Sequence, residues 1–135
     1  MKIQRIDHVG VIVDDLPAAT AFFLDFGLEM LWGADVEDES IDRVVGLDGV
    51  KNAMVMLGTP DGQATIERIK LYAPSAGQGF QQPCANTLGI RHIALSVEDI
   101  EAVVAKLKKN GTEIFSEIQN YADSYKLCYV HGRKG

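Results

Sequence analysis

The spacing of apolar side chains predicts a strand followed by a helix at the start of the chain. Residues 5–13 form an apolar run rich in β-branched side chains, which suits a strand covered on both faces. Asp14 and Asp15 end that strand, and residues 18–26 follow the apolar spacing of a helix that ends at Gly27. The remaining periodic stretches predict a strand at 28–36, a helix at 40–47 capped by Ser40, and strands at 52–57 and 63–71.

Alternation within the predicted strands assigns side chains to the two faces of a sheet. In the strand at 28–36 it places Met30 and Trp32 on one face and Leu31 on the other. In the strand at 63–71 it places Glu67 on the same face as Thr65. Because Glu67 shares this face with Thr65 and Ile69 inside a strand, an exposed carboxylate that merely pairs with a neighbouring cation is the less favoured interpretation.

The opening stretch of the chain is repeated in its second half. The matched pairs include His8 and His92, Ile6 and Ile90, Val13 and Val97, Asp15 and Asp99, and Gly27 and Gly111. The second copy predicts a strand at 89–97, a helix at about 99–109, a strand at 112–118, a loop at 119–124 and a strand near 125–131. Two of the three histidines therefore occupy one position of a duplicated unit.

The duplication predicts an α+β fold made of two β-α-β-β-β modules. The first module spans residues 1–72, a linker rich in glycine, proline and glutamine spans 73–87, and the second module spans 88–135. The second module lacks a counterpart of the strand at 63–71, so its last strand is absent from the sequence. Either the natural protein continues into that strand or the repeat is naturally incomplete; we expect the first, because a sheet without this strand keeps an open edge.

Composition and charge narrow the class of protein. With 47% hydrophobic and 24% charged residues, the chain is typical of a soluble globular domain. A net charge of −6 argues against nucleic acid or an anionic membrane as a partner, and no apolar run reaches the length of a membrane span. Cys84 and Cys128 show neither metal-binding nor disulfide spacing, so we expect unpaired thiols and a cytoplasmic location.

Two units that each open with a histidine-bearing strand resemble the vicinal oxygen chelate superfamily. This superfamily includes glyoxalase I, methylmalonyl-CoA epimerase, extradiol dioxygenases, and the fosfomycin and bleomycin resistance proteins. The resemblance rests on residues 6–16, 65–69 and 90–100 and covers nearly the whole chain. It implies that the paired modules curve into a half-open, barrel-like sheet around a cleft that holds one divalent metal ion.

The resemblance also implies a set of metal ligands. Glyoxalase-type and epimerase-type members use the first and fourth strands of each module, which gives His8, Glu67 and His92 here, with a fourth ligand expected beyond Gly135. Imidazole and carboxylate donors suit Zn²⁺, Ni²⁺, Co²⁺, Fe²⁺ or Mn²⁺. In the family, the ion binds two neighbouring substrate oxygens and stabilises an enediolate, and Glu67 is the candidate catalytic residue that carries the proton.

Each candidate ligand also has a simpler structural interpretation. A single histidine on an apolar strand is more often a buried structural residue than a ligand, and Glu67 could pair with Arg68 or Lys70. The duplicated histidine position, together with a glutamate on the fourth strand, favours the metal site. His131 lacks such support and is predicted to lie on the surface or at a pocket rim.

The predicted function is that of a glyoxalase-like, metal-dependent lyase or isomerase acting on a small molecule. One alternative is a bleomycin-resistance-type binding protein without catalysis, although retention of the three candidate ligands counts against it. Another is an extradiol dioxygenase, in which the carboxylate ligand comes from the final strand and Glu67 would be idle. A metal-dependent protein with a different substrate is a further possibility. Because family members often dimerise, we expect a homodimer, with neither nucleic acid nor membrane as a partner.

Overall fold

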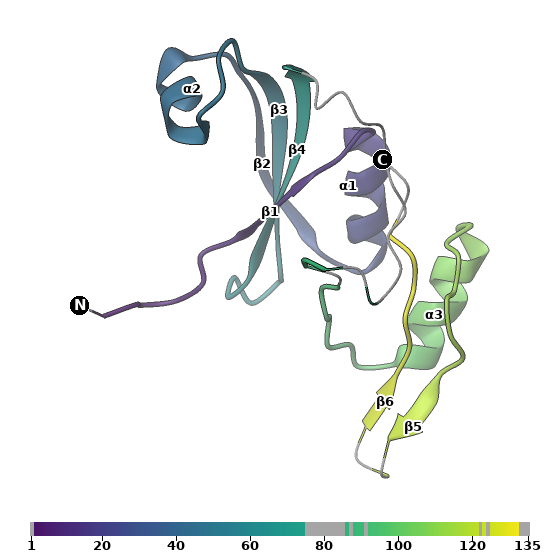
Figure 1. The fold of residues 1–135 in the computed structure, drawn as a ribbon. Helices are drawn as coiled ribbons and strands as arrows, with labels where there is room; N and C mark the ends of the chain where they lie inside the picture. Colours follow the sequence, from purple (N-terminus) through teal and green to yellow (C-terminus); the bar gives the residue numbers. More distant parts are fainter. Residues whose placement is uncertain are drawn as a thin grey trace. The chain divides into compact units, whose positions relative to one another are not determined.

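The computed structural model describes residues 2–74, 86, 88–90, 92–121, 123 and 125–132. These residues form three helices, a four-stranded mixed sheet and a two-stranded sheet, and the described strands form no closed barrel (Figure 1). The predicted α+β class is therefore confirmed. The chain divides into two compact units, Met1–Phe80 with Lys134–Gly135, and Gln81–Arg133.

The first unit is built on a sheet whose strand order is β1-β4-β3-β2. The strands are β1 (Val9–Ile12), β2 (Glu29–Val36), β3 (Lys51–Gly58) and β4 (Thr65–Ala73). β1 runs parallel to β4, and the other neighbouring strands are antiparallel. This order brings the start of the chain beside β4, far from it in sequence.

β1 is shorter than the strand predicted at 5–13. Its ladder begins where Val9 pairs with Ile66, and β4 itself begins at Thr65. In this register His8 would fall opposite Thr65, the first residue of β4, so residues 5–7 have no β4 residues alongside which to continue the parallel ladder.

Helix α1 (Leu16–Asp25) begins and ends where the sequence indicates. The Asp15 carboxylate accepts a hydrogen bond from the Ala18 amide at 2.9 Å, which caps the helix N-terminus. Gly27 has a positive φ of 97°, which side chains with a Cβ disfavour. The buried residues of α1 include Phe23, and the helix packs on β3 and β4.

Helix α2 (Glu39–Val45) corrects the cap predicted from sequence. Asp38, not Ser40, is the N-cap, and its carboxylate accepts a hydrogen bond from the Ser40 amide at 2.7 Å. Asp38 has extended backbone angles, whereas Ser40 already lies in the first helical turn, where a cap cannot sit.

The core of the first unit lies between α1 and the sheet. Leu57 is fully buried, and Arg68 is buried to 7% exposure on the face that α1 covers. The Arg68 guanidinium carbon lies 4.7 Å from the centre of the Phe23 ring, a cation–π contact. Burial lowers the pKa of Arg68 to about 10.

A β-bulge overturns the prediction that Leu31 and Trp32 lie on opposite faces. The register shifts between Met30 and Trp32, which leaves Leu31 as the extra residue. Trp32 lies opposite Met56 of β3. Gly58, two residues after Met56 in β3, faces the same side of the sheet, and a Cβ built on it would lie only 2.9 Å from the Leu31 side chain. Leu31 and Trp32 therefore share one face of the sheet.

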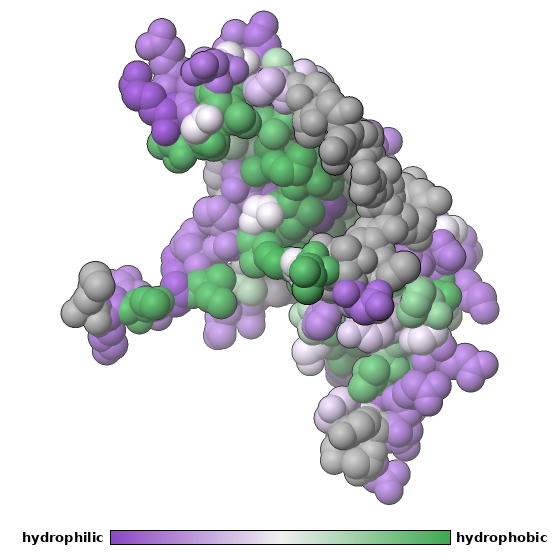
Figure 2. Space-filling view, viewed as in Figure 1, coloured by the Kyte–Doolittle hydropathy of each residue, from purple (hydrophilic) through white to green (hydrophobic). Residues whose placement is uncertain are grey.

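Part of the surface of the first unit is apolar. On α2, Val44 and Val45 are exposed, and on β2 Met30, Leu31 and Trp32 are each about half exposed. Figure 2 shows apolar side chains along the strands of this unit and on the part of α2 next to them, whereas the rest of α2 is hydrophilic.

The second unit contains α3 (Ile100–Lys109) and the hairpin strands β5 (Gln119–Tyr121) and β6 (Tyr125–Leu127). Asp99 caps α3 by accepting a hydrogen bond from the Ala102 amide at 3.0 Å. Asp15 makes the equivalent hydrogen bond to the Ala18 amide in the first unit. The two copies of the repeat therefore share the same helix-capping interaction as well as similar sequences.

The strands predicted in the second unit are largely wrong. The described residues from 88 to 97 form no strand, residues 112–118 contribute only a bridge from Ile114 to Val130, and β5 lies in the predicted loop. In the first unit, β1 pairs with β4 alone, and no described segment of the second unit takes the position of β4 beside residues 92–97. Without such a partner, an apolar run has no backbone ladder to join.

No helix in the described ranges is both long and apolar enough to cross a membrane.

Candidate metal centre

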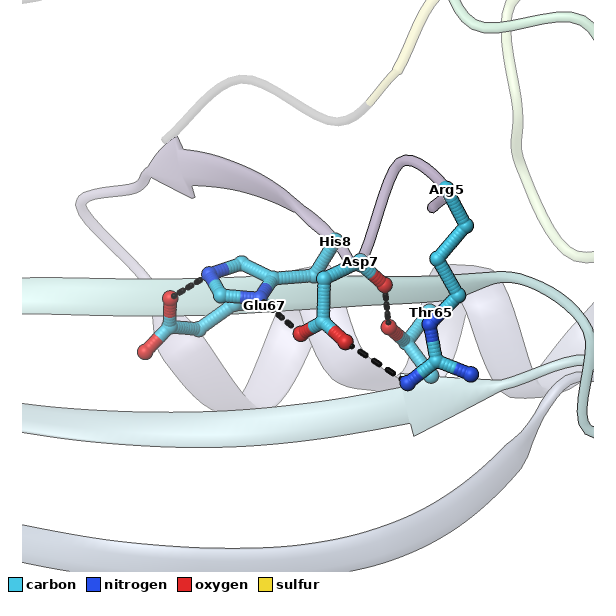
Figure 3. A network of polar contacts seen from close by, with 5 residues as sticks. All are labelled: Arg5, Asp7, His8, Thr65 and Glu67. Atoms are coloured by element: carbon cyan, nitrogen blue, oxygen red, sulfur yellow. Dashed lines mark hydrogen bonds and ion pairs between the residues drawn. The ribbon is translucent and has the colours of Figure 1, made fainter. Parts of the chain in front are cut away.

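The parallel pairing of β1 with β4 brings His8 and Glu67 together. In the register Gly10 lies opposite Glu67, and His8 stands two residues before Gly10, so its side chain projects from the same face. Nε2 of His8 lies 3.1 Å from Oε2 of Glu67 (Figure 3). Two of the three predicted ligands therefore meet within the first unit.

The other nitrogen of the His8 ring is held by Asp7. Nδ1 lies 2.9 Å from Oδ2 of Asp7, and Arg5 donates a hydrogen bond to the second Asp7 oxygen at 2.9 Å. The Thr65 hydroxyl donates to the Asp7 backbone carbonyl at 2.6 Å, which fastens this segment to β4 (Figure 3). Such a carboxylate partner typically orients a metal-binding histidine and fixes its tautomer.

The imidazole of His8 thus lies between two carboxylates. A neutral ring carries one N–H and can donate to Asp7 or to Glu67, but not to both. The pKa of His8 is raised, chiefly by the hydrogen bond to Asp7 and further by the Glu67 charge, while that same hydrogen bond lowers the pKa of Asp7. The arrangement therefore favours a cation at Nε2, either a proton or a metal ion.

Exposure and space around the pair would allow a ligand to approach. The His8 side chain is 38% exposed and the Glu67 side chain 15% exposed. A Cβ added at Gly10 would lie 3.8 Å from Oε2 of Glu67. Because Gly10 has no side chain, this side of the carboxylate remains open.

The other two histidines lie in the second unit. His92 is exposed, and its ring centre lies 5.7 Å from that of Tyr129 in an edge-to-face arrangement. His131 makes a similar contact with Phe115 at 5.1 Å. Within the described residues, no group of three or more His, Cys, Asp or Glu side chains is arranged to hold a metal ion, so the role of His92 stays a prediction.

The donor chemistry of the first unit fits part of a metal site. An imidazole nitrogen and a carboxylate oxygen face each other, and the imidazole carries an oriented partner on its far side. This donor set suits borderline divalent ions such as Zn²⁺, Ni²⁺ and Mn²⁺.

Sequence reasoning missed the residues that support the pair. Asp7, Thr65 and Gly10 act through pairing that becomes visible only when β1 lies beside β4. The duplication gives no signal for Asp7, because Arg91 stands at the equivalent position of the second copy. Its position next to His8 is the sole hint in the sequence.

The chain belongs to the glyoxalase/bleomycin resistance protein/dioxygenase superfamily, whose family model matches residues 7–129. This superfamily contains the vicinal oxygen chelate proteins that the duplicated strand resembles. The predicted family is therefore confirmed.

Individual relatives support this assignment over nearly the whole chain. The chain is 31% identical to the uncharacterized protein YwbC of Bacillus subtilis over 98% of this chain and 92% of that protein. It is similar to the crystal structure of a glyoxalase family protein from Bacillus cereus, with 36% identity, a TM-score of 0.94, and coverage of 98% and 89%. A fosfomycin resistance protein, FosX from Listeria monocytogenes, shares the fold at 17% identity with a TM-score of 0.57 and coverage of 97% and 86%; that structure is a complex with Mn(II) and a dihydroxypropylphosphonic acid.

Proposed function

We propose that this protein is a glyoxalase-like, metal-dependent lyase or isomerase that acts on a small molecule with two neighbouring oxygen atoms. The observation that carries the proposal is the 3.1 Å approach of His8 Nε2 to Glu67 Oε2, with Asp7 on the opposite ring nitrogen. A histidine oriented in this way is prepared to offer the lone pair of Nε2 to a metal ion.

The residues that would hold the ion are His8 and Glu67 of the first unit, with His92 as the proposed contribution of the second. Zn²⁺, Ni²⁺, Co²⁺, Fe²⁺ and Mn²⁺ all suit these donors. When bound, such an ion supplies Lewis-acid polarisation of substrate oxygens. The fold can house a metal, as the Mn(II) complex of FosX illustrates for that protein.

Glu67 is the residue that we assign to proton transfer. Its carboxylate is largely shielded from water, and the open position at Gly10 leaves space beside it for a substrate C–H group. Asp7 is a positioning residue, because it reaches the site only through the His8 ring.

Metal binding by the purified full chain tests this proposal. The wild type should bind one divalent ion, and His8→Ala, Glu67→Gln and His92→Ala should each weaken binding by about a hundredfold or more in competition with a fluorescent chelator. His131→Ala is the matched control and should leave the affinity unchanged. If the wild type binds no divalent ion, the enzyme proposal fails and a non-catalytic, bleomycin-resistance-type binding protein becomes the better hypothesis.

Activity assays then separate the reaction classes. Conversion of methylglyoxal hemithioacetal to an S-lactoyl thioester would identify a lyase, whereas exchange of a substrate C–H proton with deuterated solvent without that product would identify an isomerase. Extradiol ring cleavage by the iron-loaded protein would contradict the assignment of Glu67 as a ligand. A homodimer in the cytoplasm belongs to the same proposal, and light scattering tests the dimer.

A further inference from the structure

Four residues form one row across the sheet of the first unit. Gly10 of β1 lies opposite Glu67 of β4, Glu67 lies opposite Met56 of β3, and Met56 lies opposite Trp32 of β2. Neighbouring strands are about 4.8 Å apart, so Trp32 stands about 10 Å from Glu67 at the backbone, with Met56 between them. The row therefore links the candidate metal ligands to the only tryptophan in the chain.

The face that carries this row is not the face covered by α1. Arg68, the neighbour of Glu67, points the opposite way and contacts Phe23 of α1. The bulge in β2 adds Leu31 to the Glu67 face beside Trp32, and these two side chains are 50% and 48% exposed. Bulges often re-aim side chains next to functional sites, and here the bulge places two large apolar groups side by side.

Away from His8 and Glu67, the side chains on this face are mostly apolar. Between the rows of Gly58 and Asn52, the four strands place on it neither lysine nor arginine. Beside Met56 and Trp32, the next row adds Ile12, Ile69, Met54 and Ala34. The part of the face around Trp32 and Met56 therefore favours an uncharged group and offers neither lysine nor arginine to a phosphate or carboxylate.

We propose that Leu31 and Trp32, with Met56 (9% exposed) as the buried apolar floor beside them, form the subsite for an uncharged apolar or aromatic substituent of the substrate. This inference rests on the proposed function, because it places the reacting oxygens at His8 and Glu67. A flat, partly exposed indole supplies a stacking surface, and Met56, which pairs with Trp32 and is 9% exposed, supplies apolar contact beside it. The continuity of the row with Glu67 makes this group part of the same small molecule.

Two hydroxamates that differ by one phenyl group test the subsite. Acetohydroxamate and benzohydroxamate both present two neighbouring oxygens to the Mn²⁺-loaded protein. Benzohydroxamate should bind about tenfold more tightly, because its ring removes additional apolar area from water, and it should change the fluorescence of Trp32. 4-Carboxybenzohydroxamate should lose most of this advantage, because neither lysine nor arginine lies on this part of the face to pair with its charge.

Variants on the two faces of β2 provide the control. Trp32→Ala should reduce the preference for benzohydroxamate to about twofold while leaving acetohydroxamate affinity unchanged, and Trp32→Phe should retain most of the preference. Met30→Ala removes a similarly exposed apolar side chain from the opposite face and should change neither affinity. Equal affinities of the wild type for the two hydroxamates would overturn the subsite.

A metal-free arm separates this inference from the proposed function. Phenol added to protein without metal should shift the NMR signals of the Met56 methyl group and the Trp32 indole N–H. If these signals shift while neither hydroxamate binds the metal-treated protein, the enzyme proposal fails and the apolar subsite stands. If hydroxamates bind equally and phenol shifts neither signal, the subsite fails and the metal site stands.

Discussion

Nε2 of His8 and Oε2 of Glu67 lie 3.1 Å apart although the two residues belong to opposite ends of the first unit's sequence. The contact exists because β1 pairs in parallel with β4. As a result, the imidazole of His8 lies between the carboxylates of Asp7 and Glu67. Two negative groups around one ring create a place for a cation.

In metal-free protein, we expect His8 to titrate above its usual pKa of 6.5. The hydrogen bond to Asp7 is the largest cause, so Asp7→Asn should lower the pKa, as followed by the imidazole carbon-bound proton in NMR. Because the folded-state pKa is raised, the stabilisation from charged His8 is fully present below about pH 6.5 and is lost as pH rises through the raised value.

Asp61→Asn is the control for this titration. The Asp61 carboxylate accepts hydrogen bonds from Thr59 and Gln63 in the turn between β3 and β4, and it is not among the groups that raise the pKa of His8. This variant should leave the pKa of His8 unchanged. An unaltered His8 pKa in Asp7→Asn would show that Asp7 does not set it.

Asp7→Asn should also weaken metal binding, by about tenfold. Loss of an orienting carboxylate behind a histidine ligand typically costs 10- to 100-fold in affinity. Isothermal titration with Zn²⁺ measures the effect, and Asp61→Asn again serves as the control. An effect as large as that of His8→Ala would argue that Asp7 binds the ion directly.

Leu57→Ala should destabilise the protein by about 2–5 kcal/mol. Leu57 is completely buried in β3, so truncation removes buried apolar contacts and leaves a cavity. Val44, on α2, is 81% exposed, and Val44→Ala should change stability by no more than about 0.5 kcal/mol. Urea unfolding followed by circular dichroism compares the two variants, and similar midpoints would contradict the described core.

Asp15→Ala should cost about 1 kcal/mol, because it removes the N-cap of α1. Asp14→Ala is the adjacent control, since the exposed ion pair of Asp14 with Lys70 contributes little. Asp99→Ala should have a comparable effect on α3, and amide hydrogen exchange can assign each loss to its own helix. Equal protection of α1 in Asp14→Ala and Asp15→Ala would contradict the cap.

The helices, their ends and the family could be predicted from the sequence alone. Asp15 and Asp99 cap their helices, and Gly27 and Gly111 follow them with positive φ, because these interactions involve residues only a few positions apart. The duplicated strand also led to the superfamily and to His8 and Glu67 as candidates.

The strand pairing and the positions of the site residues depend on contacts between segments that are distant in the sequence. A strand needs a partner, so the apolar run at 92–97, which has none among the described strands, forms no ladder, while residues 9–12 find β4. Strand pairing likewise set the bulge that turns Leu31 toward the Trp32 face and the register that brings Glu67 to His8. These outcomes depend on contacts between distant segments, which local periodicity does not encode.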